Sequence, residues 1–75
     1  MKMDKDIFTL EIEIEGFKYE LIWYLKINTI NLFLIDSKLN KVLFDKIIVN
    51  TLFETVGERI NYIKNEIIPL FEAVG

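Results

Sequence analysis

The 75-residue sequence contains no cysteine and no histidine. Without cysteine the chain has no disulfide and no thiolate metal site, and without histidine it lacks the commonest general base and metal ligand. The motifs of phosphate-binding loops, dinucleotide-binding folds, zinc proteases and calcium loops are also missing, and the three glycines are isolated. We therefore expect no cofactor and no metal, and we expect that the protein is not an enzyme.

Arginine is scarce as well. Arg59 is the only one, and nine basic residues stand against twelve acidic ones, for a net charge of −3. Nucleic-acid partners normally require a basic surface rich in arginine, so such a partner is disfavoured. The longest apolar runs, residues 21–25 and 32–35, are far shorter than the roughly 20 residues of a membrane span. The first six residues contain no apolar signal-peptide region, so a cytoplasmic protein is expected.

The length of the chain predicts one domain, residues 1–75. A domain of this size has a small hydrophobic core. Apolar residues make up 52% of it, slightly more than the roughly 45–50% of typical domains. An interface between copies of the chain would use that excess. Within the domain we expect a frayed N-terminus over residues 1–5, a sheet over 6–49 and a helix over 51–74.

The stretch 7–27 predicts a β-hairpin with its turn at Glu15-Gly16. Apolar residues occupy even positions before this turn and odd positions after it: Phe8, Leu10, Ile12, Ile14, then Phe17, Tyr19, Leu21, Trp23, Leu25 and Ile27. Pairing Ile14 with Phe17 brings all of them to one face, because side chains alternate along a strand. The other face then carries the even positions of the second strand.

Two more strands are expected after this hairpin. Asn28-Thr29 is a plausible two-residue turn, because asparagine tolerates a positive φ; it would pair Ile27 with Ile30 and, on the other face, Tyr24 with Phe33 and Ile22 with Ile35. The polar residues 36–41 predict a loop before a strand over 42–49. Its inner face is left open between two sets: Val42, Phe44 and Ile48, or Leu43, Ile47 and Val49.

From Thr51 the apolar period changes from two to 3.6, which predicts an amphipathic helix with a capping box of Thr51 and Glu54. Its apolar stripe is formed by Leu52, Val56, Ile60, Ile63, Ile67, Leu70 and Val74. Pro69 removes one helical hydrogen bond, and we favour a kinked helix over an early end because the stripe keeps its phase. The expected fold is α+β: a four-stranded antiparallel meander with one C-terminal helix on one face (ββββα).

One helix cannot cover both faces of a sheet. The register leaves an apolar block on the outer face, formed by Ile7, Ile22, Tyr24, Phe33 and Ile35. Exposed apolar patches of this kind mark interaction surfaces. We interpret the block as the face of a homodimer or of another protein partner; coverage by the N-terminal residues or by sheet twist is the alternative.

An acidic group lies beside the block: Glu11, Glu13, Glu15 and Glu20. The simplest interpretation is a solvated strand whose charges repel other strands. A docking surface for a basic partner is the second. A carboxylate site for Mg²⁺ or Ca²⁺ is the third, because Glu11 is expected opposite Glu20.

The function these features favour is a non-enzymatic protein-interaction module. It would be a small acidic inhibitor or adaptor of the kind that phages and mobile elements direct against host proteins, self-associating through the outer sheet face. The alternative is a small nucleic-acid-binding or transcription-regulatory module. It would use the outer-face aromatic residues Tyr24 and Phe33 with the lysines Lys26, Lys41 and Lys46.

Overall fold

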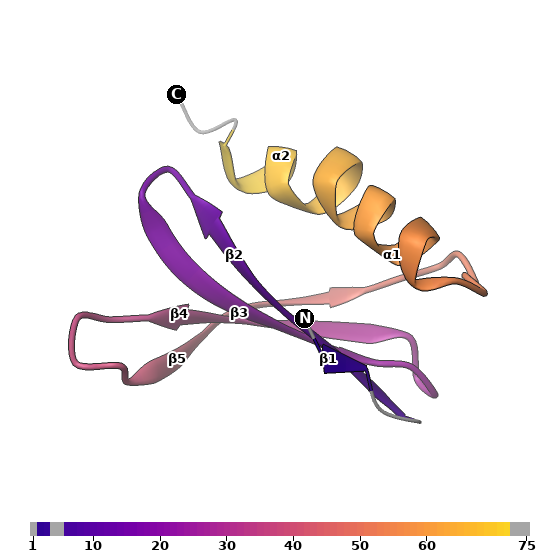
Figure 1. Cartoon of the computed structure of the whole chain (residues 1–75), viewed down its shortest axis with the longest axis horizontal. Coiled ribbons are helices and arrows are strands. Elements are labelled where there is room, and N and C mark those ends of the chain that lie inside the picture. The colour runs from indigo at the N-terminus through magenta and orange to yellow at the C-terminus, as the bar shows by residue number, and fades with distance from the viewer. Residues whose placement is uncertain (1, 4–5, 73–75) are drawn as a thin grey trace.

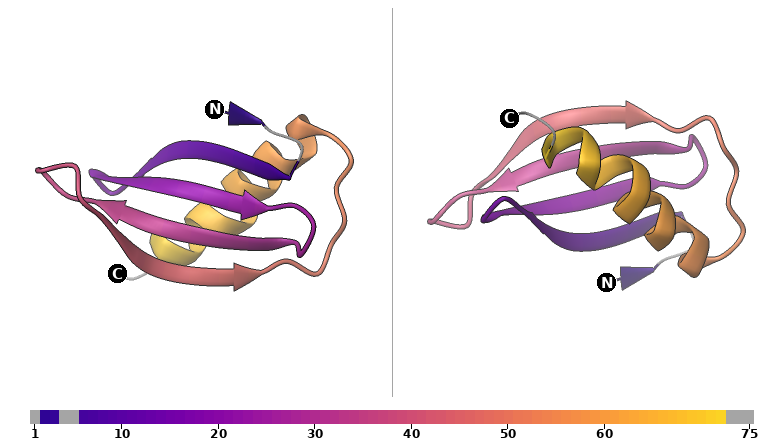
Figure 2. Two further views of the ribbon diagram at one scale, coloured as in Figure 1. Left: turned by 90° about the horizontal axis from the view of Figure 1, so that it is seen from below. Right: turned by 90° about the horizontal axis from the view of Figure 1, so that it is seen from above.

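The computed structural model describes residues 2–3 and 6–72, and in it five antiparallel strands form one sheet that a C-terminal helix covers on one face (Figures 1 and 2). The strands lie in the order of the sequence: β1 (Lys2–Met3), β2 (Ile7–Ile14), β3 (Phe17–Tyr24), β4 (Thr29–Ile35) and β5 (Lys41–Ile48). The helix consists of α1 (Val56–Tyr62), a π-helical turn η1 (Ile63–Ile67) and α2 (Ile68–Glu72). The expected meander of four strands with one helix is confirmed.

The N-terminal end departs from the expected frayed segment. Lys2 and Met3 form the short strand β1, which pairs with Thr9 and Phe8 of β2. Residues 1, 4 and 5 lie outside the described part of the chain, as do residues 73–74 of the expected helix. The sheet therefore begins earlier than the polar sequence indicated.

The β2–β3 hairpin has the register that the alternation predicts. Ile14 pairs with Phe17 at the turn, and Phe8 pairs with Trp23 at the far end. The turn residues Glu15 and Gly16 have φ angles of 51° and 86°. Positive φ at both central residues is the geometry that matches the twist of a two-residue hairpin.

The β3–β4 pairing is shifted by four residues from the expected one. Trp23 pairs with Ile30 and Tyr24 with Thr29, so residues 25–28 form a four-residue turn. Asn28 does take a positive φ, 50°, but at the end of this longer turn. Because a shift by four keeps the alternation, every residue stays on its expected face while its neighbours change.

The Asn28 side chain explains why the longer turn forms. Its Oδ1 accepts a hydrogen bond from the buried indole Nε1 of Trp23 at 2.8 Å. Its amide Nδ2 donates to the carbonyl oxygens of Val49 at 3.0 Å and Thr51 at 2.8 Å. The backbone N–H of Val49 donates back to the carbonyl of Asn28. Asn28 thus joins the β3–β4 turn to the segment that follows β5.

A β-bulge decides the register of β5. Leu43 pairs with Phe33 and Asp45 with Leu32, which leaves Phe44 as the extra residue. Neither of the two expected sets is therefore correct. A bulge shifts the alternation by one residue, so positions before and after it follow different parities.

The faces of β5 follow from this bulge. Val42 and Ile47 lie on the inner face beside Leu34 and Ile30. Phe44 lies there too, since its ring contacts that of Tyr19 at a centroid distance of 5.3 Å. Asp45, opposite Leu32, also lies on the inner face, and the outer face receives Lys41, Leu43, Lys46 and Ile48.

The helix begins four residues later than expected, with Thr55 rather than Thr51 as its N-cap residue. Thr55 and Glu58 form the capping box, with the hydroxyl of Thr55 accepting from the Glu58 N–H at 3.1 Å. The Thr51–Glu54 capping box is therefore wrong. Residues 49–55 instead form a connection that Arg59 helps to hold, because its guanidinium donates to the carbonyl of Phe53 at 2.7 Å.

Pro69 does not end the helix, in agreement with the interpretation favoured above. The chain stays helical to Glu72, and the turn before Pro69 widens so that the Ile68 N–H donates to the carbonyl of Ile63. This π-helical turn contains one additional residue, so the inward-facing positions shift by one. Ile68 and Phe71 are half-buried, whereas Leu70, placed on the expected stripe, is 61% exposed.

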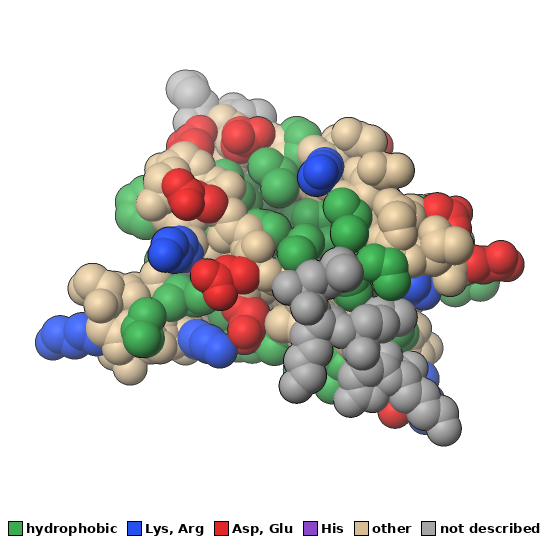
Figure 3. All heavy atoms as spheres, viewed as in Figure 1, with side chains coloured by type: hydrophobic (Ala, Val, Ile, Leu, Met, Phe, Trp, Pro, Cys, Tyr) green, Lys and Arg blue, Asp and Glu red, His purple; other side chains and the backbone are tan. Residues whose placement is uncertain are grey.

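The core lies between the helix and the inner face of the sheet, where apolar side chains gather in Figure 3. Its buried members come from the sheet, from Val49 and from η1: Phe8, Ile14, Tyr19, Leu21, Trp23, Ile30, Leu32, Val49, Ile63 and Ile67. Aromatic contacts join the two layers at both ends of the helix: Trp23 with Phe53 and Tyr62, and Phe44 with Phe71.

Gly57 offers a simple test of the helix start. A methyl group at this position would meet only the Thr55 hydroxyl at 4.0 Å, so no close approach to the sheet requires glycine. Gly57→Ala should raise the free energy of unfolding by about 0.5–1 kcal/mol, since glycine is a poor helix former. Urea unfolding followed by circular dichroism measures the change; a loss of stability would show that the first turn needs glycine.

Candidate interaction surface

The helix covers only the inner face of the sheet, and no segment of the described chain lies over the outer face (Figure 2, left). Four rows of side chains cross this face from β2 to β5. Starting at the β2–β3 turn, they are Glu13–Lys18–Ile35–Lys41, Glu11–Glu20–Phe33–Leu43, Thr9–Ile22–Asn31–Lys46 and Ile7–Tyr24–Thr29–Ile48. Each expected outer-face residue that lies in a strand is on the face to which the alternation assigned it, whereas Glu15 lies in the β2–β3 turn.

The apolar residues form a diagonal stripe rather than a block. We define the outer stripe as Ile7, Ile22, Tyr24, Phe33, Ile35 and Leu43. The first five are half-buried, and Leu43 is 53% exposed. The expected contacts of Tyr24 with Phe33 and of Ile22 with Ile35 are wrong, because the four-residue shift separates these pairs.

One polar residue interrupts the outer stripe. Asn31 lies between Ile22 and Lys46, and its Oδ1 is buried without a hydrogen-bond partner in the described part of the chain. A buried acceptor without a donor costs free energy, and native proteins contain few of them. Asn31 therefore places a polar side chain at the centre of the outer face.

The acidic residues are partly neutralised. Glu11 does lie opposite Glu20, as expected, and Glu13 lies opposite Lys18. However, the Lys41 ammonium reaches across β4 to both carboxylate oxygens of Glu20, at 3.0 and 3.1 Å. This ion pair relieves the repulsion between the two glutamates.

A metal site is not supported by this arrangement. In the residues that the structure describes, no three histidine, cysteine, aspartate or glutamate side chains are grouped closely enough to hold a metal ion. The acidic corner, Glu11, Glu13 and Glu15, is left as a charged margin of the outer stripe.

Two of the three lysines considered for nucleic-acid binding are held in ion pairs. Lys41 pairs with Glu20, and the ammonium of Lys26 lies 3.6 Å from a carboxylate oxygen of Asp6. Lys46 lies on the outer face beside Asn31. The three lysines thus do not form one basic surface beside Tyr24 and Phe33.

The sequence did not indicate a hollow of about 560 Å³ at the sheet end, between the β2–β3 and β4–β5 turns. It is lined mainly by apolar side chains and a few polar ones: Gly16, Phe17, Lys18, Leu34, Ile35, Asp36, Ser37 and Leu39. Leu39 is 78% exposed and has a φ of 65°, a conformation that favours glycine or asparagine. The polar composition of the loop gave no indication that an exposed leucine would adopt this conformation.

Asp36 builds the turn that carries Leu39. Its carboxylate accepts hydrogen bonds from the backbone N–H groups of Lys38 and Asn40, both at 2.9 Å. The bond from the Asn40 backbone is the largest cause that holds the pKa of Asp36 below its ordinary value. The turn is therefore stabilised by the ionised carboxylate.

This lowered pKa predicts a pH dependence. Because Asp36 titrates lower in the folded chain than in the unfolded one, its contribution is present above the unfolded pKa and is lost as the pH falls through the folded pKa. Thermal unfolding from pH 7 to pH 2 should show this loss below about pH 4. Asp36→Asn should remove that part of the pH dependence; an identical profile for both proteins would contradict the assignment.

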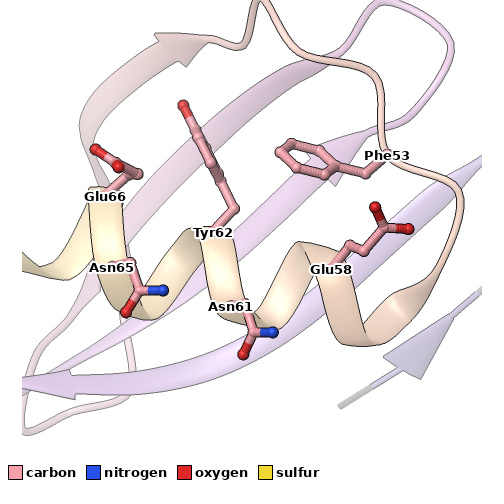
Figure 4. A pocket seen from close by; sticks show the side chains of 6 residues that line it. All are labelled: Phe53, Glu58, Asn61, Tyr62, Asn65 and Glu66. Atoms are coloured by element: carbon pink, nitrogen blue, oxygen red, sulfur yellow. The ribbon is translucent and has the colours of Figure 1, made fainter.

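A second, shallow depression of about 290 Å³ lies beside the helix (Figure 4). The rings of Phe53 and Tyr62 are tilted against each other there, with centroids 5.1 Å apart, while the side chains of Asn61 and Asn65 point away from these rings. Glu58 on its border is occupied by the capping box. The other ionisable side chains of its lining are those of Glu66 and Tyr62.

None of the helical segments described here is long and apolar enough to cross a membrane. The comparisons with known proteins add no relative: no family model matches the chain, and no curated protein or solved structure is significantly similar to it.

Proposed function

We propose that the protein is a non-enzymatic protein-binding module, acting as a small inhibitor or adaptor, and that the outer stripe is its binding surface. The observation that carries this proposal is the uncovered sheet face, on which half-buried apolar side chains run diagonally from Ile7 to Leu43. Apolar surfaces of this kind, bordered by polar residues, are typical of interaction sites.

The margin of the stripe indicates the chemistry of the partner. Glu11, Glu13 and Glu15 lie at one corner, and Glu20 is already paired with Lys41. A partner with an apolar centre and lysine or arginine residues on one side would be complementary to this surface. Such charges accelerate association and select the partner more than they add affinity.

The test is affinity capture with two matched variants. Phe33→Lys places a cation in the stripe and directly opposite Glu20, so the sheet should keep its fold. Lys64→Glu changes an exposed charge on the helix, away from the stripe. Proteins captured by the wild type should be retained by Lys64→Glu and lost, by at least tenfold, with Phe33→Lys. Equal capture by all three proteins would reject the stripe as the binding surface.

A nucleic-acid-binding role has less support, because two of the three relevant lysines are held in ion pairs. The protein should therefore not shift labelled single- or double-stranded oligonucleotides at about 100 mM salt. Tight binding that weakens steeply with salt would favour the nucleic-acid role over the proposed one.

A further inference from the structure

Strand β5 lies at the edge of the sheet but has the composition of an interior strand. Five of its eight residues are apolar, and no segment of the described chain pairs with its free edge. Four of these apolar side chains are at least 49% exposed: Val42, Leu43, Phe44 and Ile48. An edge strand of this kind presents unpaired backbone groups to any other extended chain.

The opposite edge is protected, which makes β5 the exception. Strand β2 is paired in part with β1, and its remaining residues carry the charges of Glu11 and Glu13. Charged side chains and short edge strands are the usual means of preventing sheets from joining. Strand β5 carries Lys41, Lys46 and a bulge, but four of its apolar side chains are exposed beside these devices.

Apolar residues flank the free edge of β5 on both faces of the sheet. Val42 and Phe44 lie on the inner side, and Leu43 and Ile48 on the outer side. Phe71 of α2 packs against Phe44 at 5.5 Å, so the end of the helix lies beside the inner side of this edge. A further strand beside β5 would cover apolar residues on both faces at once.

We propose that this strand is β5 of a second copy of the chain. The two β5 strands pair antiparallel about a two-fold axis that passes between Phe44 and Asp45. Lys41 then lies opposite Ile48 of the second copy, Val42 opposite Ile47, Leu43 opposite Lys46, and Phe44 opposite Asp45. The result is one continuous sheet with a helix from each copy on the same face, a closed arrangement in which both copies use the same surface.

The bulge selects this register. Because Phe44 and Asp45 share the inner face, the proposed pairing places inner residues opposite inner ones and outer residues opposite outer ones along all of β5. Sliding the copies by two residues in one direction puts Lys41 opposite Lys46, where like charges repel. Sliding them the other way puts Asp45 opposite Lys46, whose side chains point to different faces.

This inference does not depend on the function proposed for the outer stripe. Edge pairing joins the two sheets along their β5 edges and leaves five of the six stripe residues of each copy uncovered, since only Leu43 belongs to both surfaces. A dimer through the outer face would instead bury both stripes. Phe33→Lys separates the two cases, because it should leave an edge-paired dimer intact and dissociate a face-to-face one.

The first test introduces a charge at Leu43 and then reverses the charge of Lys46, its proposed partner in the second copy. Leu43→Lys puts two lysines opposite each other at both symmetric positions and should weaken the dimer about tenfold in sedimentation equilibrium. Adding Lys46→Glu to Leu43→Lys should restore the dimer, and Lys64→Glu on the helix should change nothing. Leu43 is exposed, so the monomer should stay folded.

The second test uses the absence of cysteine from the chain. A mixture of Leu43→Cys and Lys46→Cys should form a disulfide-linked heterodimer on oxidation, because directly opposite residues have Cα atoms roughly 4.5–5.5 Å apart. A mixture of Leu43→Cys and Ile48→Cys should not. The proposal is overturned if the wild-type protein is monomeric at about 100 μM, as an edge protected by its bulge and lysines would be, or if only the mismatched pair cross-links.

Discussion

Replacing Asn28 with alanine is expected to lower the free energy of unfolding by about 3–4 kcal/mol. The substitution removes three side-chain hydrogen bonds, and the Nε1 of the buried Trp23 and the carbonyl of Val49 lose their partner. It also forces alanine to adopt a φ of 50°. A domain of this size has a stability of roughly 4–11 kcal/mol, so the substitution should remove at least about a quarter of it.

Two matched variants separate the causes. Asn28→Gly keeps the positive φ at little strain, so it should cost about 1 kcal/mol less than alanine. Asn28→Asp keeps the acceptor for Trp23 but loses both amide donors and places a carboxylate beside the carbonyls of Val49 and Thr51. Urea unfolding followed by the fluorescence of Trp23 ranks all three. An alanine variant within 1 kcal/mol of the wild type would show that Asn28 does not hold the turn to the connection.

Ile67→Ala is expected to lower the free energy of unfolding by about 3 kcal/mol. Ile63 and Ile67 are the fully buried side chains of the described helical segments, and Ile67 is only 1% exposed. Removing most of this side chain leaves a cavity between the helix and the sheet. Urea and thermal unfolding should show the loss of stability. The backbone amide hydrogens of the helix should also exchange faster with solvent.

Leu70→Ala is the control for Ile67→Ala. A regular α-helix would place Leu70 and Ile67 on the same apolar stripe. In the structure the π-helical turn precedes Leu70, and its side chain is 61% exposed. Leu70→Ala should therefore change the stability of the monomer by less than about 0.5 kcal/mol. Similar losses from the two substitutions would mean that the helix has regular phase and that the π-helical turn is absent in solution.

The hairpin β2–β3 shows what the sequence contained about the fold. Its period-two alternation changes parity at Glu15-Gly16, and a two-residue turn there keeps every apolar residue, including Ile14 and Phe17 beside the turn, in a strand and on one face. The β3–β4 connection was less well marked, since turns of two and four residues give the same faces. The choice depends on the side chain of Asn28, whose partners Val49 and Thr51 come more than twenty residues later.

The helix illustrates a second limit. Its existence and its apolar face followed from the 3.6-residue period, but its first turn did not. Both Thr51–Glu54 and Thr55–Glu58 have the spacing of a capping box, and the structure uses the second because residues 49–55 are needed to reach the inner face. Apart from Pro69, no feature of the sequence indicates the π-helical turn that precedes it.

The sequence predicted on which face of the sheet the site residues lie, but not which residues contact one another there. The alternation assigned Phe33 and Tyr24 to the outer face correctly, yet their contacts depended on the register of β4. The Lys41–Glu20 ion pair spans three strands, so no local pattern could indicate it. The bulge at Phe44 likewise shows only in the structure.

The order of the strands has a consequence for how the chain folds. Every strand pairs with its neighbour in sequence, so the sheet can form by closing short loops one after another. The helix is expected to pack on the sheet only after the strands have paired, because its buried residues contact strands that lie far earlier in the chain. We therefore expect rapid, single-exponential folding in which the strands associate first. Ile67→Ala should accelerate unfolding more than it slows folding, whereas substitutions in the β2–β3 hairpin should do the reverse.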